Sequence, residues 1–144
     1  MKIAICGSAN FPEKIREMER GLMERGHEVV IPHAIKKYGL KSYDDGKRLK
    51  EDPEYRRTIK PYLTRRHFDE VKDADAILVV NTEKRGIPDY IGGGTFAEIM
   101  FAFYHGKKIF LLNPVPEHGM FDFIRDEIEA ANPVVIHGNL DMVK

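Results

Sequence analysis

The apolar residues of this chain fall into two patterns, short continuous runs and longer segments with helical spacing. The short runs are rich in β-branched residues and have the length of buried strands. The longer segments place apolar residues three and four positions apart, which is typical of helices that bury one face. The runs that we predict as strands span residues 2–6, 27–31, 76–80, 108–112 and 133–137.

Helices are predicted in the gaps between these strands. Pro12 suits a first helical turn and Gly26 suits a helix end, so they bound the first helix. Pro61 lies inside the second helical segment and is expected to bend it. The further helical segments lie at 53–74, 95–104 and 121–131. In the segment 53–74 the predicted inward side chains are Tyr55, Ile59, Tyr62, Leu63, Phe68 and Val71.

Strands that alternate with helices along a chain form parallel sheets that are covered on both faces. We therefore predict an α/β fold with one domain over residues 1–144, a three-layer α/β/α sandwich of flavodoxin-like or Rossmann-like type. Its five parallel strands are expected in the order 2-1-3-4-5, with a switch point between the first and third strands. A length of 144 residues suits a single core of this kind.

Residues 33–53 interrupt the pattern. This span is polar and shows no steady period, so it is predicted to be an excursion or lid rather than part of the core. Charge is also uneven here, because residues 36–66 contain eleven Lys and Arg against five Asp and Glu. A basic flank would suit an anionic ligand such as a phosphate, whereas a solvated surface would explain most of these residues equally well.

Composition excludes several classes of protein. The formal net charge is zero, so neither nucleic acid nor a membrane is an expected partner. Cys6 is the single cysteine, which rules out a disulfide within the chain and fits a reducing cytoplasm. No apolar stretch approaches membrane-spanning length, and Met1 leads directly into a strand, so no leader segment is expected. We expect no metal and no cofactor.

Three loops of the predicted fold converge at the carboxyl edge of the sheet, where such folds bind ligands. One follows the first strand over residues 7–11, one follows the third strand at Asn81, and one is the glycine-rich entry into the next helix over residues 92–98. Glycines allow close backbone approach, and a helix start offers unpaired N–H groups. For Gly7 and Ser8 plain turn chemistry is an equal alternative. The candidate substrate-binding residues are Gly7, Ser8, Phe11, Arg66, Asn81, Gly92, Gly93, Gly94 and Thr95.

Glu98 is the one carboxylate near the start of that helix, and it has two interpretations. A negative side chain beside a ligand-sized gap is a candidate nucleophile. The sequence Thr95-Phe96-Ala97-Glu98 also fits a capping box, in which Thr95 caps the helix and Glu98 reaches back to the Thr95 N–H. His67 lies near the end of the preceding helix, where a lone histidine is more often structural than catalytic.

The segment Gly94-Thr95-Phe96-Ala97-Glu98 reads G-T-x-x-E, follows the strand A-D-A-I-L-V-V, and opens a helix of small residues. With this order of elements the chain resembles, over nearly its whole length, the nucleoside 2-deoxyribosyltransferase family, which includes deoxynucleoside-monophosphate N-glycosidases. The resemblance implies that Glu98 is the nucleophile that attacks the anomeric carbon. It also implies that Phe11 stacks on the base and that Gly7 and Ser8 line the sugar or phosphate pocket.

Two positions depart from the family's pattern. Members usually carry an acidic residue six positions before the nucleophile, where this chain has Gly92. They also usually carry an aspartate on the helix before the third strand, and the corresponding position here is His67. Either His67 assists the departing base, or this branch performs different chemistry. A glycine in place of the acid could make room for a phosphate.

The function predicted from these residues is cleavage or transfer of an N-glycosidic bond in a nucleoside or nucleoside 5′-monophosphate. Glu98 would form a glycosyl-enzyme intermediate, and His67 would donate a proton or a hydrogen bond to the leaving base. Water as acceptor gives a hydrolase and a second base gives a transferase. The alternatives are a lysine-decarboxylase-like phosphoribohydrolase, suggested by the glycines before Thr95, and a non-catalytic nucleotide-binding sensor module.

A homo-oligomer, dimeric or larger, is also expected. The helix at 95–104 is apolar around its whole circumference, so its outer side needs a cover in addition to the sheet. The family resemblance implies the same, because neighbouring subunits of that family complete each other's sites.

Overall fold

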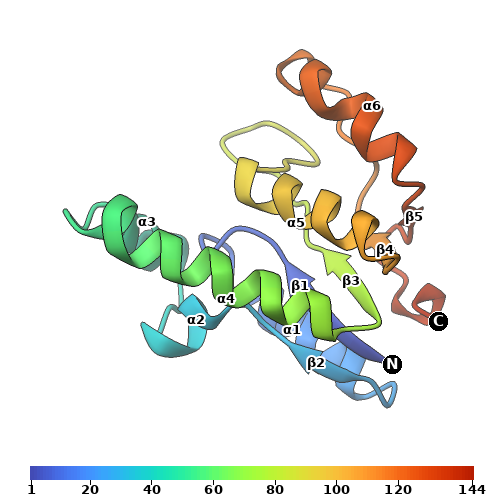
Figure 1. Ribbon diagram of the computed structural model, residues 1–144, viewed down its shortest axis with the longest axis horizontal. Helices are drawn as coiled ribbons and strands as arrows, with labels where there is room; N and C mark the ends of the chain where they lie inside the picture. The colour runs from blue at the N-terminus through green and yellow to red at the C-terminus, as the bar shows by residue number, and fades with distance from the viewer.

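The computed structural model describes residues 1–144 and contains one five-stranded parallel sheet. The strand order is β2-β1-β3-β4-β5, as predicted (Figure 1). β1 and β3 lie side by side at the centre, and Cys6 at the end of β1 pairs with Val79 at the end of β3. The strands are β1 (Lys2–Cys6), β2 (Glu28–Val30), β3 (Ala76–Val79), β4 (Lys108–Leu111) and β5 (Val134–Val135).

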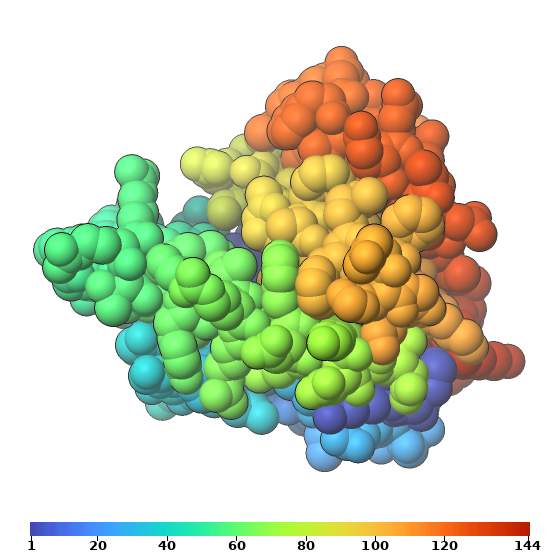
Figure 2. Space-filling model, in the orientation of Figure 1, coloured from blue at the N-terminus to red at the C-terminus, as the bar shows by residue number.

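Helices cover both faces of this sheet, which confirms the predicted three-layer α/β architecture. α4, α5 and α6 lie together over one face, and Figure 2 shows their outer surface. α1 packs on the other face. The α-helices are α1 (Pro12–Met23), α2 (His33–Lys37), α3 (Tyr43–Lys50), α4 (Lys60–Asp73), α5 (Gly93–Tyr104) and α6 (Asp122–Ala130). Shorter turns are the π-helical η1 (Tyr55–Ile59) and the 3-10 turns η2 (Gly119–Phe121) and η3 (Leu140–Met142).

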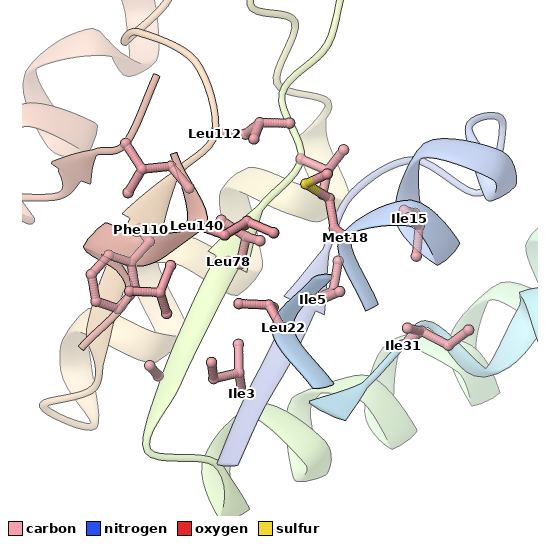
Figure 3. Packing of buried hydrophobic residues seen from close by; sticks show 14 of the residues in the cluster. Ile3, Ile5, Ile15, Met18, Leu22, Ile31, Leu78, Phe110, Leu112 and Leu140 are labelled. Atoms are coloured by element: carbon pink, nitrogen blue, oxygen red, sulfur yellow. The ribbon is translucent and has the colours of Figure 1, made fainter. Parts of the chain in front are cut away.

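Side chains that alternate along each strand build two separate cores. Ile3 and Ile5 face α1, and Figure 3 shows them directed towards Leu22 and Met18 on that helix. Ala4 and Cys6 point to the opposite face and join the core beneath α4 and α5. Because both faces of β1, β3 and β4 are buried, these strands read as continuous apolar runs rather than as alternating ones.

Residues 33–53 add no strand to the sheet, but part of this span packs into the core, which the sequence does not predict. They form α2 and α3, and three apolar residues of this span, Ala34, Ile35 and Leu40, are buried in the core on the α1 side. Ala34 and Ile35 are adjacent, and four exposed residues separate them from Leu40, so no helical period is visible in the sequence. Ser42 caps α3, with its hydroxyl accepting a hydrogen bond from the Asp45 N–H at 3.2 Å.

The segment before β3 is helical from Tyr55 to Asp73, in line with its prediction. The π-helical η1 runs directly into α4, and Pro61 lies where the one becomes the other. Tyr62 is 44% exposed instead of inward, with its ring beside His33 and beneath the ammonium of Lys37. The buried side of α4 carries His67 in its place.

Apolar side chains remain exposed on the outer surface of α5 and α6. Tyr104 is 84% exposed and Phe103 is 48% exposed at the end of α5, and Phe123 on α6 is 78% exposed. This surface is compatible with the homo-oligomer predicted from the sequence, which stays a prediction. None of the helices is both long and apolar enough to cross a membrane.

Gly46 allows α3 to pack directly on the loop that follows β1. A Cβ atom at this position would lie 2.6 Å from the carbonyl oxygen of Ala9 and 2.9 Å from the Cα of Asn10. Both are backbone atoms of a segment that Asn10 also ties to α3, because its side-chain amide donates to the Tyr43 carbonyl at 3.3 Å. Gly46 therefore fixes the distance between α3 and the β1–α1 loop.

We predict that Gly46→Ala destabilises the protein by about 1–3 kcal/mol, the usual cost of overpacking, because neither backbone segment can yield without moving. Thermal or urea unfolding measures this loss. Gly119→Ala is the matched control, since its Cβ would meet only the Asp122 carboxylate at 3.8 Å. Equal stability of the two variants would show that α3 can move away from the loop without loss.

Candidate active site

A cavity of about 280 Å³ opens at the carboxyl edge of the sheet, beside β1 and β3. Its walls come from the β1–α1 loop, α2, α3, α4 and the start of α5. This is the switch point of the strand order, where α/β folds of this kind bind ligands. Eight of the eleven residues predicted for the site line it: Gly7, Ser8, His67, Gly92, Gly93, Gly94, Thr95 and Glu98.

The start of α5 does not form the capping box that the sequence also allows. Gly92 occupies the cap position, so Thr95 is already inside the first turn of the helix and makes no capping hydrogen bond. Glu98 accepts no hydrogen bond from the Thr95 N–H, and its Oε2 atom is buried without any hydrogen-bond partner. The capping interpretation of Glu98 is therefore wrong, because the glycines at 93 and 94 extend the helix backwards by two residues.

His67 lies directly beside Glu98. Its Nε2 atom is 3.8 Å from Glu98 Oε2 and 3.6 Å from the sulfur of Cys6, at the end of β1. On the other side of the ring, Nδ1 is 2.8 Å from Oε2 of Glu70, one turn further along α4. Arg66 holds the second oxygen of Glu70 at 3.3 Å. The imidazole is thus fixed between two carboxylates.

Burial and charge act against each other in this cluster. Burial alone would lower the pKa of His67, but the carboxylates of Glu98 and Glu70 outweigh it and the pKa is raised. Burial raises the pKa of Glu98, and neighbouring His67 opposes this shift without cancelling it. Burial and the charge of Glu98 raise the pKa of Cys6, so the thiol stays protonated. A positive imidazole beside a carboxylate is the charge arrangement that follows.

A group of cations borders the same cavity. Lys50, Lys60 and Lys84 line it, and none of the three forms an ion pair. Partial desolvation, together with the charges of Lys84, Lys60 and Arg85, lowers the pKa of Lys50 to about 8. Its ammonium group donates a hydrogen bond to the side-chain oxygen of Asn10. Several cations held together without an acidic partner are electrostatically suited to an anion.

The glycines at the start of α5 make room for this arrangement. A Cβ at Gly94 would lie 3.2 Å from the ammonium of Lys60, so a side chain there would crowd the lysine. A Cβ at Gly92 would meet only the Tyr90 ring, at 3.8 Å, so this position leaves open space beside the helix start. The first residues of α5 therefore present bare backbone to the cavity, and Lys60 of α4 lies against them.

Three of the predicted site residues lie outside the lining of the cavity. Phe11 packs beside Tyr43, with ring centroids 5.8 Å apart, in a neighbouring hollow. Arg66 pairs with Glu70. Asn81 is buried, and its amide donates to the carbonyls of Asn113 and Pro114, each at 2.9 Å, so it joins the ends of β3 and β4. The predicted roles of these residues in substrate binding are untested.

Sequence reasoning missed several residues of the site. Glu70 could have been found from its spacing, because residues three apart on a helix share a face and Glu70 follows His67 by three. Lys50 and Lys60 fall within the basic segment noted in the sequence, but nothing singled them out from their neighbours. Cys6 ends an apolar run, and that pattern indicates a buried strand residue without a further role. Its contact with His67 joins positions 61 residues apart, which local patterns do not reveal.

Comparison with known proteins adds a fold likeness. No protein-family model matches the chain, and no curated protein matches it in sequence. The solved structure of a 2-deoxyribosyltransferase from the psychrotolerant bacterium Bacillus psychrosaccharolyticus is similar, with a TM-score of 0.53 and 18% sequence identity. The likeness covers 77% of this chain and 71% of that chain. What it shows is the fold. That enzyme is described as a biocatalyst for the synthesis of nucleosides.

The cation group predicts that the cavity binds inorganic phosphate, and that Lys50 contributes to the binding. Lys50 is charged below about pH 8 and loses its charge as the pH rises through that value, so phosphate affinity should fall between pH 7 and pH 9.5. Lys50→Met should weaken binding about tenfold or more at pH 7, the range for a lost charge-assisted hydrogen bond. Calorimetric titration with phosphate measures both effects.

Lys47→Met is the matched control for this experiment. Lys47 is exposed on the same helix and does not line the cavity, so this variant should bind phosphate as the wild type does. Equal phosphate affinity in wild type and Lys50→Met would exclude Lys50 from the anion site.

Proposed function

We propose that this protein cleaves the N-glycosidic bond of a nucleoside 5′-monophosphate, with Glu98 as the nucleophile. The observation that carries the proposal is a carboxylate with no hydrogen-bond partner on Oε2, at the wall of a cavity that also presents unpaired cations. A carboxylate serves to attack the sugar, and cations serve to hold a phosphate. The fold likeness to a 2-deoxyribosyltransferase supports nucleoside chemistry in general.

The first step replaces the bond between the anomeric carbon and the base with a bond to Glu98. A carboxylate oxygen attacks the anomeric carbon, and the base leaves with the electron pair of the glycosidic bond. His67 supplies a proton from Nε2 to the departing base, while Glu70 accepts the hydrogen bond from Nδ1 and holds the ring in place. The transition state resembles an oxocarbenium ion, as in retaining glycosidases.

The second step releases the sugar from Glu98. His67, now neutral at Nε2, accepts a proton from the acceptor as the acceptor attacks the anomeric carbon. If the acceptor is water, the products are the free base and the sugar phosphate. If it is a second base, the product is a new nucleotide. Both outcomes use the same first step and the same residues.

The phosphate would lie against Lys50, Lys60 and Lys84, close to the start of α5. The N–H groups and the positive end of the helix dipole favour an anion there. The open space beside Gly92 supports a phosphorylated substrate, because no carboxylate repels the phosphate at that position. An unphosphorylated nucleoside would leave the cation group without a partner, so it should be a poorer substrate.

A panel of nucleosides and their 5′-monophosphates, in the ribose and the 2-deoxyribose series, tests this proposal. Each is incubated with the protein, with and without a second base, and free base is measured by chromatography. Release from monophosphates in preference to nucleosides supports the proposal. Release from the ribose series alone would favour the phosphoribohydrolase alternative. Binding of nucleotides without any release would favour the sensor alternative.

We predict that Glu98→Gln abolishes base release while the protein stays folded. Glutamine keeps the shape of the side chain but is not a carboxylate nucleophile. Because Glu98 caps no helix, the substitution breaks no capping bond, and the melting temperature should stay within a few degrees of the wild type. Glu129→Gln on the exposed side of α6 is the control. Base release by Glu98→Gln at the wild-type rate would exclude Glu98 as the nucleophile.

For His67, we predict that His67→Ala lowers kcat by about a hundred- to ten-thousand-fold with little change in KM, the range for loss of a general acid. His67→Asp should recover part of this loss, because the nucleoside 2-deoxyribosyltransferase family usually carries an aspartate at the corresponding position. The deficit of His67→Ala should shrink for a substrate whose leaving group needs no proton, such as a nitrophenyl 2-deoxyriboside 5-phosphate. A purely structural histidine would instead cause the same deficit with both leaving groups.

A further inference from the structure

We propose that Cys6, His67 and Glu98 form a binding site for Zn²⁺ at the inner end of the cavity. The three side chains come from β1, α4 and α5, and each offers one ligand atom to the same point. Sγ of Cys6, the imidazole nitrogen of His67 and the carboxylate oxygen of Glu98 all lie within 4.8 Å of one another. Sulfur, imidazole nitrogen and carboxylate oxygen are the three ligand types that zinc accepts in proteins.

The distances between these atoms are close to those of a tetrahedral zinc site. Zn–S and Zn–N bonds of ordinary length at the tetrahedral angle separate the two ligand atoms by about 3.6 Å. The observed separation of Cys6 Sγ and His67 Nε2 is 3.6 Å. For imidazole nitrogen and carboxylate oxygen the ideal separation is about 3.4 Å. His67 Nε2 and Glu98 Oε2 are 3.8 Å apart, so a small rotation of Glu98 completes the geometry.

The surroundings of the three residues fit the same interpretation. Glu70 accepts a hydrogen bond from Nδ1 of His67, which leaves Nε2 free to bind a metal when the ring is neutral. A carboxylate behind a metal-binding histidine is a recurrent feature of zinc sites, because it orients the ring and raises its basicity. The Glu98 Oε2 atom is buried and has no other partner, and a cation would supply one.

The ligand set selects for the type of metal. A thiolate and an imidazole favour Zn²⁺ and similar transition metals over Mg²⁺ and Ca²⁺, which prefer oxygen ligands only. Three protein ligands leave the fourth position of a tetrahedral ion open. His67 and Glu98 both line the cavity, so this position faces the space in which a substrate would lie. Water or a phosphate oxygen is the expected fourth ligand.

Zinc binding would switch off the reaction proposed above, and this consequence rests on that proposed function. An ion coordinated by Glu98 and His67 occupies the lone pairs that nucleophilic attack and proton transfer require. The same cluster therefore has two exclusive states, one with protons on the imidazole and the thiol and one with a metal, whose binding releases these protons. The protein would act as a glycosidase only when zinc is scarce.

Titration of the metal-free protein, residues 1–144, with Co²⁺ tests the site directly. Cobalt replaces zinc in tetrahedral sites and gives a thiolate-to-metal absorption band when sulfur is a ligand. Cys6 is the only cysteine of the chain, so a band with one Co²⁺ per protein assigns the ligand without any variant. We expect this band, its loss on addition of one equivalent of Zn²⁺, and a higher melting temperature with Zn²⁺. Absence of the band would overturn the proposal.

Three variants test the three proposed ligands one at a time. Cys6→Ala should remove the band, and Glu98→Gln and His67→Gln should weaken Co²⁺ binding by at least about tenfold. His33→Ala is the matched control, because His33 lines the same cavity but is not one of the ligands. Circular dichroism verifies that each variant is folded. A band retained in folded His67→Gln and Glu98→Gln at wild-type affinity would also overturn the proposal.

A separate experiment tests the consequence for activity. Base release by the wild type should fall to background with one equivalent of Zn²⁺ and return on addition of a chelator. If the metal-free protein releases no base from any substrate, the proposed function fails while the cobalt titration still decides the zinc site. If base release continues at full rate with zinc bound, the exclusive relation between metal and reaction is wrong.

Discussion

The packing of α4 against α5 is the contact on which the site depends. Phe68 of α4 stacks on Phe101 of α5, with ring centroids 4.6 Å apart and planes inclined by 21°. Because His67 is next to Phe68 in α4, this stack fixes the position of His67 along the helix relative to Glu98 on α5. At the other end of the contact, the absence of a side chain at Gly94 allows Lys60 to approach α5. The two helices bring an acid, a base and a cation to one edge of the sheet.

The same contact removes these groups from water, which changes their chemistry. A carboxylate on a protein surface is strongly solvated and a poor nucleophile. Glu98 keeps 15% of its side chain exposed, and its nearest charged neighbour is an imidazole. Burial makes ionisation of Glu98 costly, and His67 offsets part of that cost. A neutral side chain at position 67 would therefore alter the charge state of Glu98 as well as removing a proton donor.

The fold could be predicted from the sequence because its signals are local and repeated. Each strand is an apolar run, and a helix lies between successive strands. Connections of this kind make the strands parallel. The α2–α3 region could not be predicted in the same way, because its core residues are one adjacent pair, Ala34 and Ile35, and Leu40, within a charged segment. The glycine loop and Glu98 were recognisable from their place after β3. The pairing of Cys6 with His67 was not, because it depends on the distance between a strand and a helix that only the packed structure sets.

The side chains of the site are held in two different ways, and the tight contact at Gly46 belongs to one of them. Glu98 and His67 are held by helices that pack directly on the sheet, whereas Lys50 is held by α3, which rests on a loop through a glycine. The segment from α2 to η1 is inserted between β2 and α4 and contributes no strand. Exchange of this insertion during evolution would change the cation that α3 brings to the cavity and leave Glu98 and His67 in place. Under the proposed function, substrate choice and bond cleavage would then diverge independently.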